Sequence, residues 1–213
     1  MKRVLLCCAL VIACTANAQS VKFGLQGNVA DVSVYKPLNE VYGLGYGGGI
    51  HLDVKFLLFS FRLSGDFLTF APDVDRYKNA AGTLLGASSA GLAVDGGRIN
   101  VISGNINGKM TVLPLPFIGP YVTGGVGIVN VSFSEAKVSL NGNRVFTVPA
   151  VKGETKPAVN FGVGADLDFG GLSLYAEVKY VVIFTKGGEI IQGVKVSDEG
   201  TIKYLPITVG ITF

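Results

Sequence analysis

The stretch that decides the fold is Leu44–Phe70, LGYGGGIHLDVKFLLFSFRLSGDFLTF. Two runs within it, Leu44–Phe56 and Phe59–Phe70, alternate apolar or aromatic residues with glycine and polar or charged residues. A period of two over ten or more residues predicts a β-strand with one apolar face. Because only Leu57-Leu58 separates the two runs, we predict an antiparallel hairpin with a tight turn.

The same period occurs eight times along the chain, and no long segment has a helical period. Each run has the roughly ten residues that a tilted strand needs to cross a bilayer. Glycine on both faces of Phe117–Phe133 leaves open which of its faces is inside. The six further predicted strands are Val21–Val32, Ile102–Val112, Phe117–Phe133, Val159–Phe169, Leu172–Val182 and Leu205–Phe213.

The connections between these strands alternate strictly between tight and long. The tight ones are Leu57-Leu58, Leu113–Pro116 and Gly170-Gly171, and the long ones are Ser33–Gly43, Ala71–Gly97, Ser134–Lys156 and Thr185–Lys203. An up-and-down barrel with short periplasmic turns, long external loops and both termini in the periplasm requires this order. We therefore predict an all-β fold, an eight-stranded antiparallel up-and-down transmembrane β-barrel.

The first residues have the three parts of a secretory signal: basic Lys2-Arg3, an apolar run over 4–13, and small residues at 16–18. We predict a signal peptide over 1–18 that is cleaved, and a single barrel domain over 19–213. The apolar run is shorter than the roughly 20 residues of a transmembrane helix, and no later segment offers one. A helical membrane protein is excluded.

All three cysteines, Cys7, Cys8 and Cys14, lie in the predicted signal. The mature chain therefore has no disulfide, thiolate metal site or thiol nucleophile. Val11-Ile12-Ala13-Cys14 also resembles a lipoprotein processing site, so acylation of Cys14 stays open as an alternative.

Charge and composition exclude one class of partner and indicate another. The net charge is +3, or +1 without Lys2 and Arg3, and the basic residues form no cluster that would indicate nucleic-acid binding. Charged residues make up 15% of the chain, against about 25% in a typical soluble domain. With a mean hydropathy of +0.48, much of this protein must face something other than water.

The polar face of the predicted strands carries five basic and five acidic residues together with the single histidine. A narrow lumen needs few charges and needs them paired, because an unpaired buried charge is costly. We predict that this face is inside and forms a structural ion-pair network of Lys22, His51, Asp53, Lys55, Arg62, Asp66, Lys109, Asp166, Asp168, Glu177 and Lys179.

The aromatic residues divide between the two ends of the predicted strands, as two interfacial girdles would. The tight-turn group is Phe56, Phe59, Phe117, Phe169 and Phe213, and the loop-end group is Tyr46, Phe67, Phe161, Tyr180 and Tyr204. Tryptophan, common in such girdles, is absent. A soluble or lipidated periplasmic barrel with these aromatics in an apolar core, binding an apolar ligand, is the main alternative.

Three segments carry a resemblance to a known family: Gly119–Gly127 (GPYVTGGVG), Phe161–Asp168 (FGVGADLD) before a Gly-Gly turn, and Tyr175–Tyr180 (YAEVKY). With the terminal run Leu205–Phe213, the whole mature chain resembles the outer-membrane β-barrel domain family, the OmpA-like and porin-family small barrels. The resemblance implies an outer-membrane location in a Gram-negative type of envelope, with outer-membrane lipid as the surroundings.

The resemblance also implies that the final strand is the sorting signal read by the barrel assembly machinery, through Tyr204, Ile207, Val209, Ile211 and Phe213. The spacing by itself shows only an amphipathic last strand. Phe213 closing the barrel against Val21 and Phe23 is the plainer interpretation, and the two are compatible.

The sequence offers no catalytic, cofactor or metal site that a structural explanation does not account for better. Some eight-stranded barrels modify lipid A with His and Ser, so His51 near Asp53 and Ser60, Arg62 or Ser64 is a candidate hydrolase site. His51, however, lies mid-strand on the predicted lumen face, out of reach of acyl chains. Gly43–Gly48 matches a dinucleotide motif by letter only, because it opens a strand instead of a helix.

We expect a non-enzymatic monomer with an ion-paired, non-conducting lumen, since an eight-stranded barrel is just wide enough for side chains to fill. It would serve envelope integrity or surface interaction through its four long loops, and a lipid A-modifying enzyme is the second alternative. One interpretation of the long loops is a surface partner at 134–156, which contains a β-hairpin around Asn141-Gly142, or at 185–203, where 189–196 and 201–204 could extend the flanking strands. The other is a solvated loop that only shields the barrel mouth.

Overall fold

The computed structural model describes residues 20–31, 42–56, 58–73, 75, 91–113, 115–185, 190–191, 194–195 and 200–213. The predicted signal peptide, its cleavage site and Cys14 lie outside the described residues. So do most of the predicted loop 33–43 and the middle of the predicted loop 71–97.

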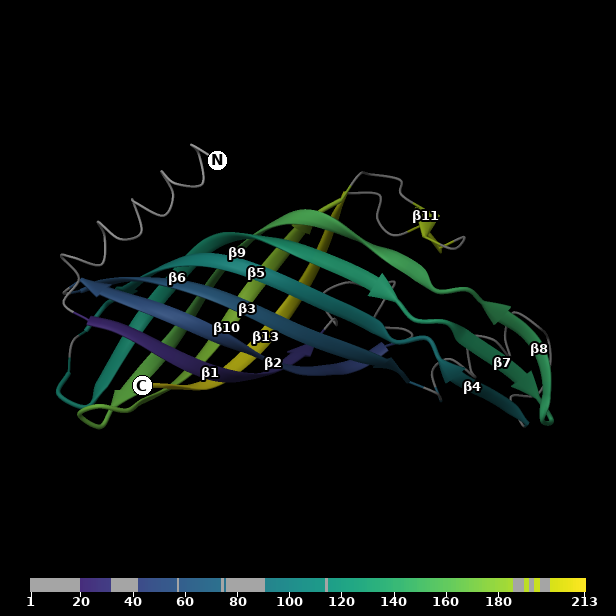
Figure 1. The fold of residues 1–213 in the computed structure, drawn as a ribbon, viewed down its shortest axis with the longest axis horizontal. Coiled ribbons are helices and arrows are strands. Elements are labelled where there is room, and N and C mark those ends of the chain that lie inside the picture. Colours follow the sequence, from purple (N-terminus) through teal and green to yellow (C-terminus); the bar gives the residue numbers. More distant parts are fainter. Residues whose placement is uncertain are drawn as a thin grey trace, which may run out of the picture.

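Eight strands of the described chain form a closed antiparallel barrel, which confirms the predicted fold (Figure 1). Around the barrel the order is β1-β13-β10-β9-β6-β5-β3-β2, so each strand pairs with its barrel neighbours in sequence and β1 closes on β13. The strands are β1 (Ser20–Asp31), β2 (Tyr42–Phe56), β3 (Phe59–Pro72), β5 (Ile99–Thr111), β6 (Ile118–Phe133), β9 (Val151–Asp168), β10 (Ser173–Phe184) and β13 (Thr201–Thr212).

Three barrel strands begin three or more residues before the predicted alternation, and β5 does so at Ile99 instead of Ile102. β9 begins at Val151, whereas the apolar alternation begins at Val159, and β13 begins at Thr201, as the predicted extension over 201–204 required. The intervening residues of β9, KGETKPA over 152–158, have no apolar face, although they continue the ladder with β6 as far as Val151. Backbone pairing extends the strand where side-chain periodicity gives no signal.

A three-stranded sheet, which we call the arm, projects past the barrel at the loop end (Figure 1). It consists of β4 (Leu92–Gly96), β7 (Ala136–Leu140) and β8 (Asn143–Val148). The predicted β7–β8 hairpin is confirmed: Asn141 and Gly142 have φ of 50° and 82°, the left-handed values of a type I′ turn. β11 (Ile190–Ile191) and β12 (Val194–Lys195) pair with each other and do not extend β10, in contrast to the prediction for 189–196.

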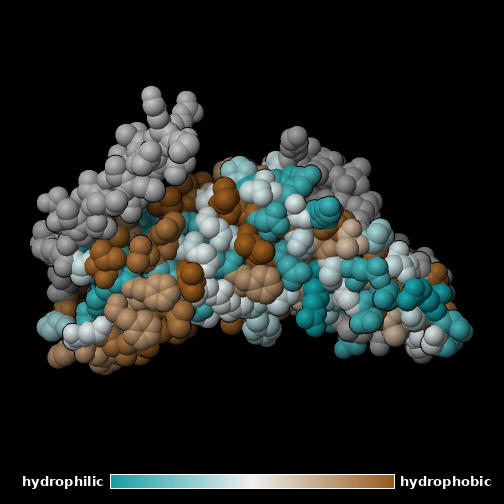
Figure 2. All heavy atoms as spheres, viewed as in Figure 1, coloured by the Kyte–Doolittle hydropathy of each residue, from teal (hydrophilic) through white to brown (hydrophobic). Residues whose placement is uncertain are grey.

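In the part of the barrel wall towards the tight turns, the polar face of each strand points inward and the apolar face outward, as the alternation predicts. In β6, whose phase was open, Tyr121, Thr123 and Val129 are buried inside and Val122 and Val126 are exposed outside. Hydrophobic atoms gather over the tight-turn end of the visible face, while hydrophilic residues predominate towards the arm (Figure 2).

One loop-end aromatic departs from the predicted girdle. Tyr204 is buried inside the barrel with 6% exposure, because its position on β13 is in phase with the inward Thr208. Phe67 and Phe161 of the same predicted group are exposed outside, and the rings of Phe161 and Tyr180 lie 5.3 Å apart. Among the described residues, no helix is long and apolar enough to span a membrane.

Candidate functional site

A charged layer fills the middle of the lumen. Asp53 of β2 and Arg62 of β3 are directly paired positions in the ladder, so both side chains enter the lumen at one height. Arg62 donates two hydrogen bonds to the Asp53 carboxylate, of 2.7 and 2.8 Å, and both residues are 1% exposed. Lys109 of β5 lies 3.9 Å from Asp53 and 3.3 Å from both oxygens of Asp166. This bidentate pair with a bridging lysine neutralises most of the buried charge.

Two inward tyrosines enclose these cations. The Arg62 guanidinium lies 4.1 Å from the centre of the Tyr175 ring, and the Lys109 ammonium lies 3.9 Å from the centre of the Tyr121 ring. Such contacts stabilise a desolvated cation by about 2 kcal/mol or more. They hold the two cations at fixed positions in the lumen.

Glycines on neighbouring strands leave the space for both rings. A Cβ at Gly210 would collide with the Tyr175 ring, and one at Gly164 would collide with the Tyr121 ring. No side chain fits at either glycine with the ring in place.

His51 is held by neutral hydrogen-bonding groups. Its Nε2 lies 3.1 Å from the Thr212 hydroxyl and its Nδ1 lies 3.4 Å from the Tyr175 hydroxyl, which also donates to Gln26 at 2.5 Å. The imidazole is 2% exposed and meets the edge of the Tyr175 ring. Since both ring nitrogens contact Thr or Tyr hydroxyls, no serine nucleophile is paired with this histidine in the part of the barrel that the structure describes.

The remaining buried acids have different partners. Asp66 accepts hydrogen bonds from the amides of Gln26 and Asn28, the second at 2.8 Å. Thr208 of β13 donates to Asn28 at 2.7 Å, so this polar cluster crosses the seam where the barrel closes. Glu177 pairs with Lys179, two residues along β10 on the same face, at 2.9 Å.

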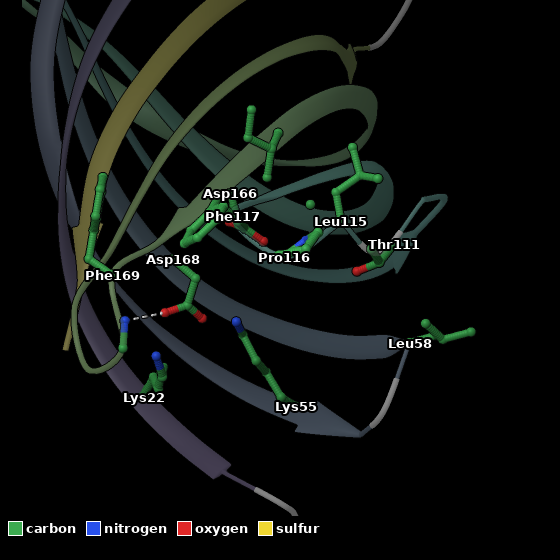
Figure 3. Close-up of a pocket in the computed structure, with 13 residues that line it drawn as sticks. Lys22, Lys55, Leu58, Thr111, Leu115, Pro116, Phe117, Asp166, Asp168 and Phe169 are labelled. Atoms are coloured by element: carbon green, nitrogen blue, oxygen red, sulfur yellow. Dashed lines mark hydrogen bonds between the residues drawn. The ribbon is translucent and has the colours of Figure 1, made fainter.

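The other predicted network members line an open vestibule at the tight-turn end, with a volume of about 810 Å³. Lys22, Lys55 and Asp168 point into it, and Phe117 and Phe169 lie at its wall (Figure 3). Lys22 donates to Ser173 at 3.2 Å, and Asp168 accepts from the Gly170 backbone at 2.9 Å. The structure thus brings Asp53, Arg62, Lys109 and Asp166 into one chain of ion pairs. It places the other three charges at the open vestibule, where Lys22 and Lys55 are half-buried and Asp168 is exposed.

Above the charged layer the lumen becomes apolar, which sequence reasoning missed. A cluster of inward residues fills the loop end of the barrel: Ala30, Leu68, Phe70, Ile99, Val101, Val129, Ala158, Val181, Ile183 and Tyr204. We call it the apolar plug. The cavity between the plug and the polar layer has a volume of about 20 Å³, room for about one water molecule. The polar lumen that the alternation predicts is therefore only the lower part of the interior.

The phase of β6 explains what the sequence did not reveal. Its glycines hid the inward direction of Tyr121 and Val129. The sequence therefore could not predict the contact of Lys109 with the Tyr121 ring, or the place of Val129 in the plug. On β3 and β5, by contrast, Leu68-Thr69-Phe70 and Ile99-Asn100-Val101 alternate visibly. There the inward residue is apolar and the outward one polar, the reverse of the lower barrel.

The chemistry available in this lumen is ion pairing and hydrogen bonding. Among the described residues, no three His, Cys, Asp or Glu side chains gather as metal ligands. The side chains fill the middle and the loop end of the lumen and pair most of its charges, while amide groups hold Asp66.

Known structures share the fold. Neisserial surface protein A, a protein of Neisseria, is 12% identical, covers 90% of this chain and 94% of its own, and superposes with a TM-score of 0.50. Ail, the attachment invasion locus protein of Yersinia pestis, is 13% identical over 91% of this chain and 97% of its own, with a TM-score of 0.43. A major outer membrane protein from Thermus thermophilus is 13% identical over 92% and 99%, with a TM-score of 0.46.

No protein-family profile matches the sequence, and no curated protein matches it significantly. At such low identity the likeness to Neisserial surface protein A concerns the fold alone. By fold, the chain is a small eight-stranded β-barrel of the kind found in outer-membrane proteins.

Proposed function

We propose that this chain is a non-enzymatic, monomeric integral outer-membrane barrel with a closed lumen, which acts in envelope integrity or surface interaction through its loop end. The observation that carries the proposal is the reversal of the usual burial pattern. Phe117, Phe169 and Phe161 are 74, 65 and 61% exposed, whereas Arg62 and Asp53 are 1% exposed. Such a belt of apolar side chains is unfavourable in water and favourable in lipid.

Fractionation and gel mobility test the location. We expect the protein in the outer-membrane fraction, with a faster band in unboiled SDS samples that shifts on boiling as the barrel unfolds. A soluble periplasmic barrel would instead appear in the periplasmic fraction. A lipidated one would stay with the membrane only while its lipid anchor is attached. The Cys14→Ala variant separates these cases, because it releases a lipoprotein and leaves an integral barrel in the membrane.

A closed lumen predicts an absence of ion flow. A closed lumen is supported by the charged layer and the apolar plug, which fill the interior at two levels among the described residues, with a cavity of about 20 Å³ between them. In planar bilayers the purified barrel should give no stable conductance steps, while a large general porin measured in parallel does. Stable, large openings would contradict the closed lumen without contradicting membrane insertion.

Membership of the OmpA-like and porin-family small barrels is part of the proposal. It is supported by the strand order, the alternation of tight and long connections and the amphipathic β13. We propose on the same ground that the barrel assembly machinery reads Tyr204, Ile207, Val209, Ile211 and Phe213. The last four have outward positions on β13 and after it, whereas Tyr204 is inside.

The assembly role of Phe213 is separable from its part in closing the barrel. Its backbone N–H donates to Phe23 O at 2.7 Å, a bond that any residue would keep, and its side chain is 54% exposed. Phe213→Ala should therefore lower the yield of assembled barrel in cells while the refolded protein keeps its unfolding midpoint. Equal yields in cells would contradict the sorting role.

The arm is the proposed site of surface interaction, because it projects farthest from the barrel and pairs only within itself (Figure 1). A variant in which a short turn replaces 136–148 separates the two proposed roles. If it restores detergent resistance to cells that lack the protein, the barrel serves envelope integrity without the arm. If cell-surface attachment alone is lost, the arm carries the interaction.

A further inference from the structure

The polarity of both barrel faces inverts near the loop end. On the lower part of β5, Ile106 points outward and Asn107 inward, whereas on the upper part Asn100 points outward and Val101 inward. Alternate residues keep pointing to the same sides all along the strand. What changes is their polarity, because the outward residue becomes polar and the inward one apolar. The lower pattern is that of a lipid-facing barrel and the upper that of a barrel in water.

The inversion runs across neighbouring strands, at positions that pair in the ladder. Thr69 of β3 pairs with Asn100 of β5, and Asn100 pairs with Ser132 of β6. Asn130, also on β6, donates to Thr155 of β9 at 3.3 Å. These five outward polar residues form a continuous belt, which we call the polar collar, around the side of the barrel that continues into the arm.

The apolar plug lies behind the polar collar. Phe70, Ile99, Val101 and Val129, which point inward on β3, β5 and β6, are 2, 3, 6 and 0% exposed. A wall with outward amides and hydroxyls over an apolar interior is stable in water. In hydrocarbon, an outward amide without a hydrogen-bond partner is strongly unfavourable.

The apolar belt below the collar matches the bilayer in height. On β3 outward apolar residues run over Phe59–Phe67, and on β5 over Ile102–Met110. Each run has nine residues, about the 9–11 that a tilted strand needs to cross the hydrocarbon core. The strands are therefore longer than the membrane requires, and the excess carries the inverted pattern.

We propose that the bilayer ends below the polar collar and that the upper barrel is a water-exposed module, closed by the apolar plug and bearing the arm clear of the lipid surface. This inference rests on membrane insertion as proposed above. It assigns Phe67, Ile102 and Ile128 to lipid, and Thr69, Asn100 and Asn130, two residues along the same strands, to water.

Depth-dependent tryptophan quenching tests the boundary, and the lack of any native tryptophan gives zero background. Six single variants are needed: Phe67→Trp, Thr69→Trp, Ile102→Trp, Asn100→Trp, Ile128→Trp and Asn130→Trp. Each is refolded into vesicles of ordinary or acyl-chain-brominated phosphatidylcholine, with Phe117→Trp as a control in the lower belt. Unboiled gel mobility confirms that every variant is folded.

The proposal expects Phe67→Trp, Ile102→Trp and Ile128→Trp to lose most of their emission in brominated lipid. Thr69→Trp, Asn100→Trp and Asn130→Trp should keep theirs and be quenched by aqueous iodide. If brominated lipid quenches both members of each pair equally, the collar lies in the membrane and the inference fails. If no variant responds to brominated lipid, including Phe117→Trp, membrane insertion itself fails.

Discussion

At the scale of single residues, the lumen depends on a few charges that are almost fully buried. Asp53 is the common partner of Arg62 and Lys109, and all three side chains are 3% exposed or less. A buried ion pair adds little to the stability of the fold compared with apolar residues in its place. Loss of one partner, however, leaves the other as an unpaired buried charge. The position of each charge therefore matters more than their number.

Asp53→Asn should destabilise the barrel by about 3–5 kcal/mol, because Arg62 keeps its charge and loses its bidentate acceptor. The measurement is the urea midpoint of the detergent-refolded barrel, read by loss of the fast band on unboiled gels. Asp168→Asn is the matched control, since Asp168 is exposed and lines the vestibule. Equal midpoints for the two variants would show that the central ion pairs do not stabilise the fold.

Gly210→Ala should cost about 1–3 kcal/mol, the usual penalty for overpacking. The new Cβ would collide with the Tyr175 ring, which in turn holds Arg62 and His51. Gly108→Ala, on an outward face with its nearest neighbour at 3.9 Å, should leave the urea midpoint unchanged. A neutral Gly210→Ala would mean that the tyrosine shifts without cost.

At the scale of strands and hairpins, period two predicted all eight barrel strands, and the Asn141-Gly142 turn predicted the hairpin of the arm. The sequence allowed no prediction where the alternation of apolar and polar residues was absent. Glycine hid the phase of β6, and the polar run 152–158 hid the first part of β9. The ion-pair partners also lay beyond prediction, since which inward charges meet depends on the register of strands and on how far each side chain reaches.

Gly142→Val should loosen the β7–β8 hairpin without disturbing the barrel. A β-branched residue is strained at a φ of 82°, whereas Val145→Thr on β8 keeps a β-branched, exposed side chain and serves as control. Limited proteolysis of the refolded proteins should cut the Gly142→Val variant faster within 136–148, with an unchanged unboiled gel mobility. Identical cleavage rates would argue that the arm is held by something other than its own turn.

At the scale of the whole molecule, the interior has three levels: an open vestibule, a charged layer and an apolar plug. The plug fills the upper part of the barrel among the described residues. If the bilayer ends below the polar collar as proposed, the same strands contact lipid below the collar and support the arm above it.

Val129→Asp should destabilise the barrel, because its carboxylate would enter the fully buried plug with no cation beside it. Val126→Asp, three residues earlier but outward at 60% exposure, should instead oppose insertion into lipid. The first variant is read by the urea midpoint in detergent and the second by the yield of folded barrel in vesicles. A plug variant as stable as the original chain would mean that water fills the upper lumen.

The seam between β1 and β13 joins residues that are far apart along the chain, and this governs when the barrel can close. The hydrogen bond from Thr208 to Asn28 spans 180 positions, whereas the other barrel pairs are hairpins of sequence neighbours. Hairpins form early because their loops are short, and the seam must wait for all of them. Until then β1 and β13 are two open edges that can pair with another chain. We therefore expect misassembly to occur before the seam between β1 and β13 closes, and weak packing of the finished barrel to matter less.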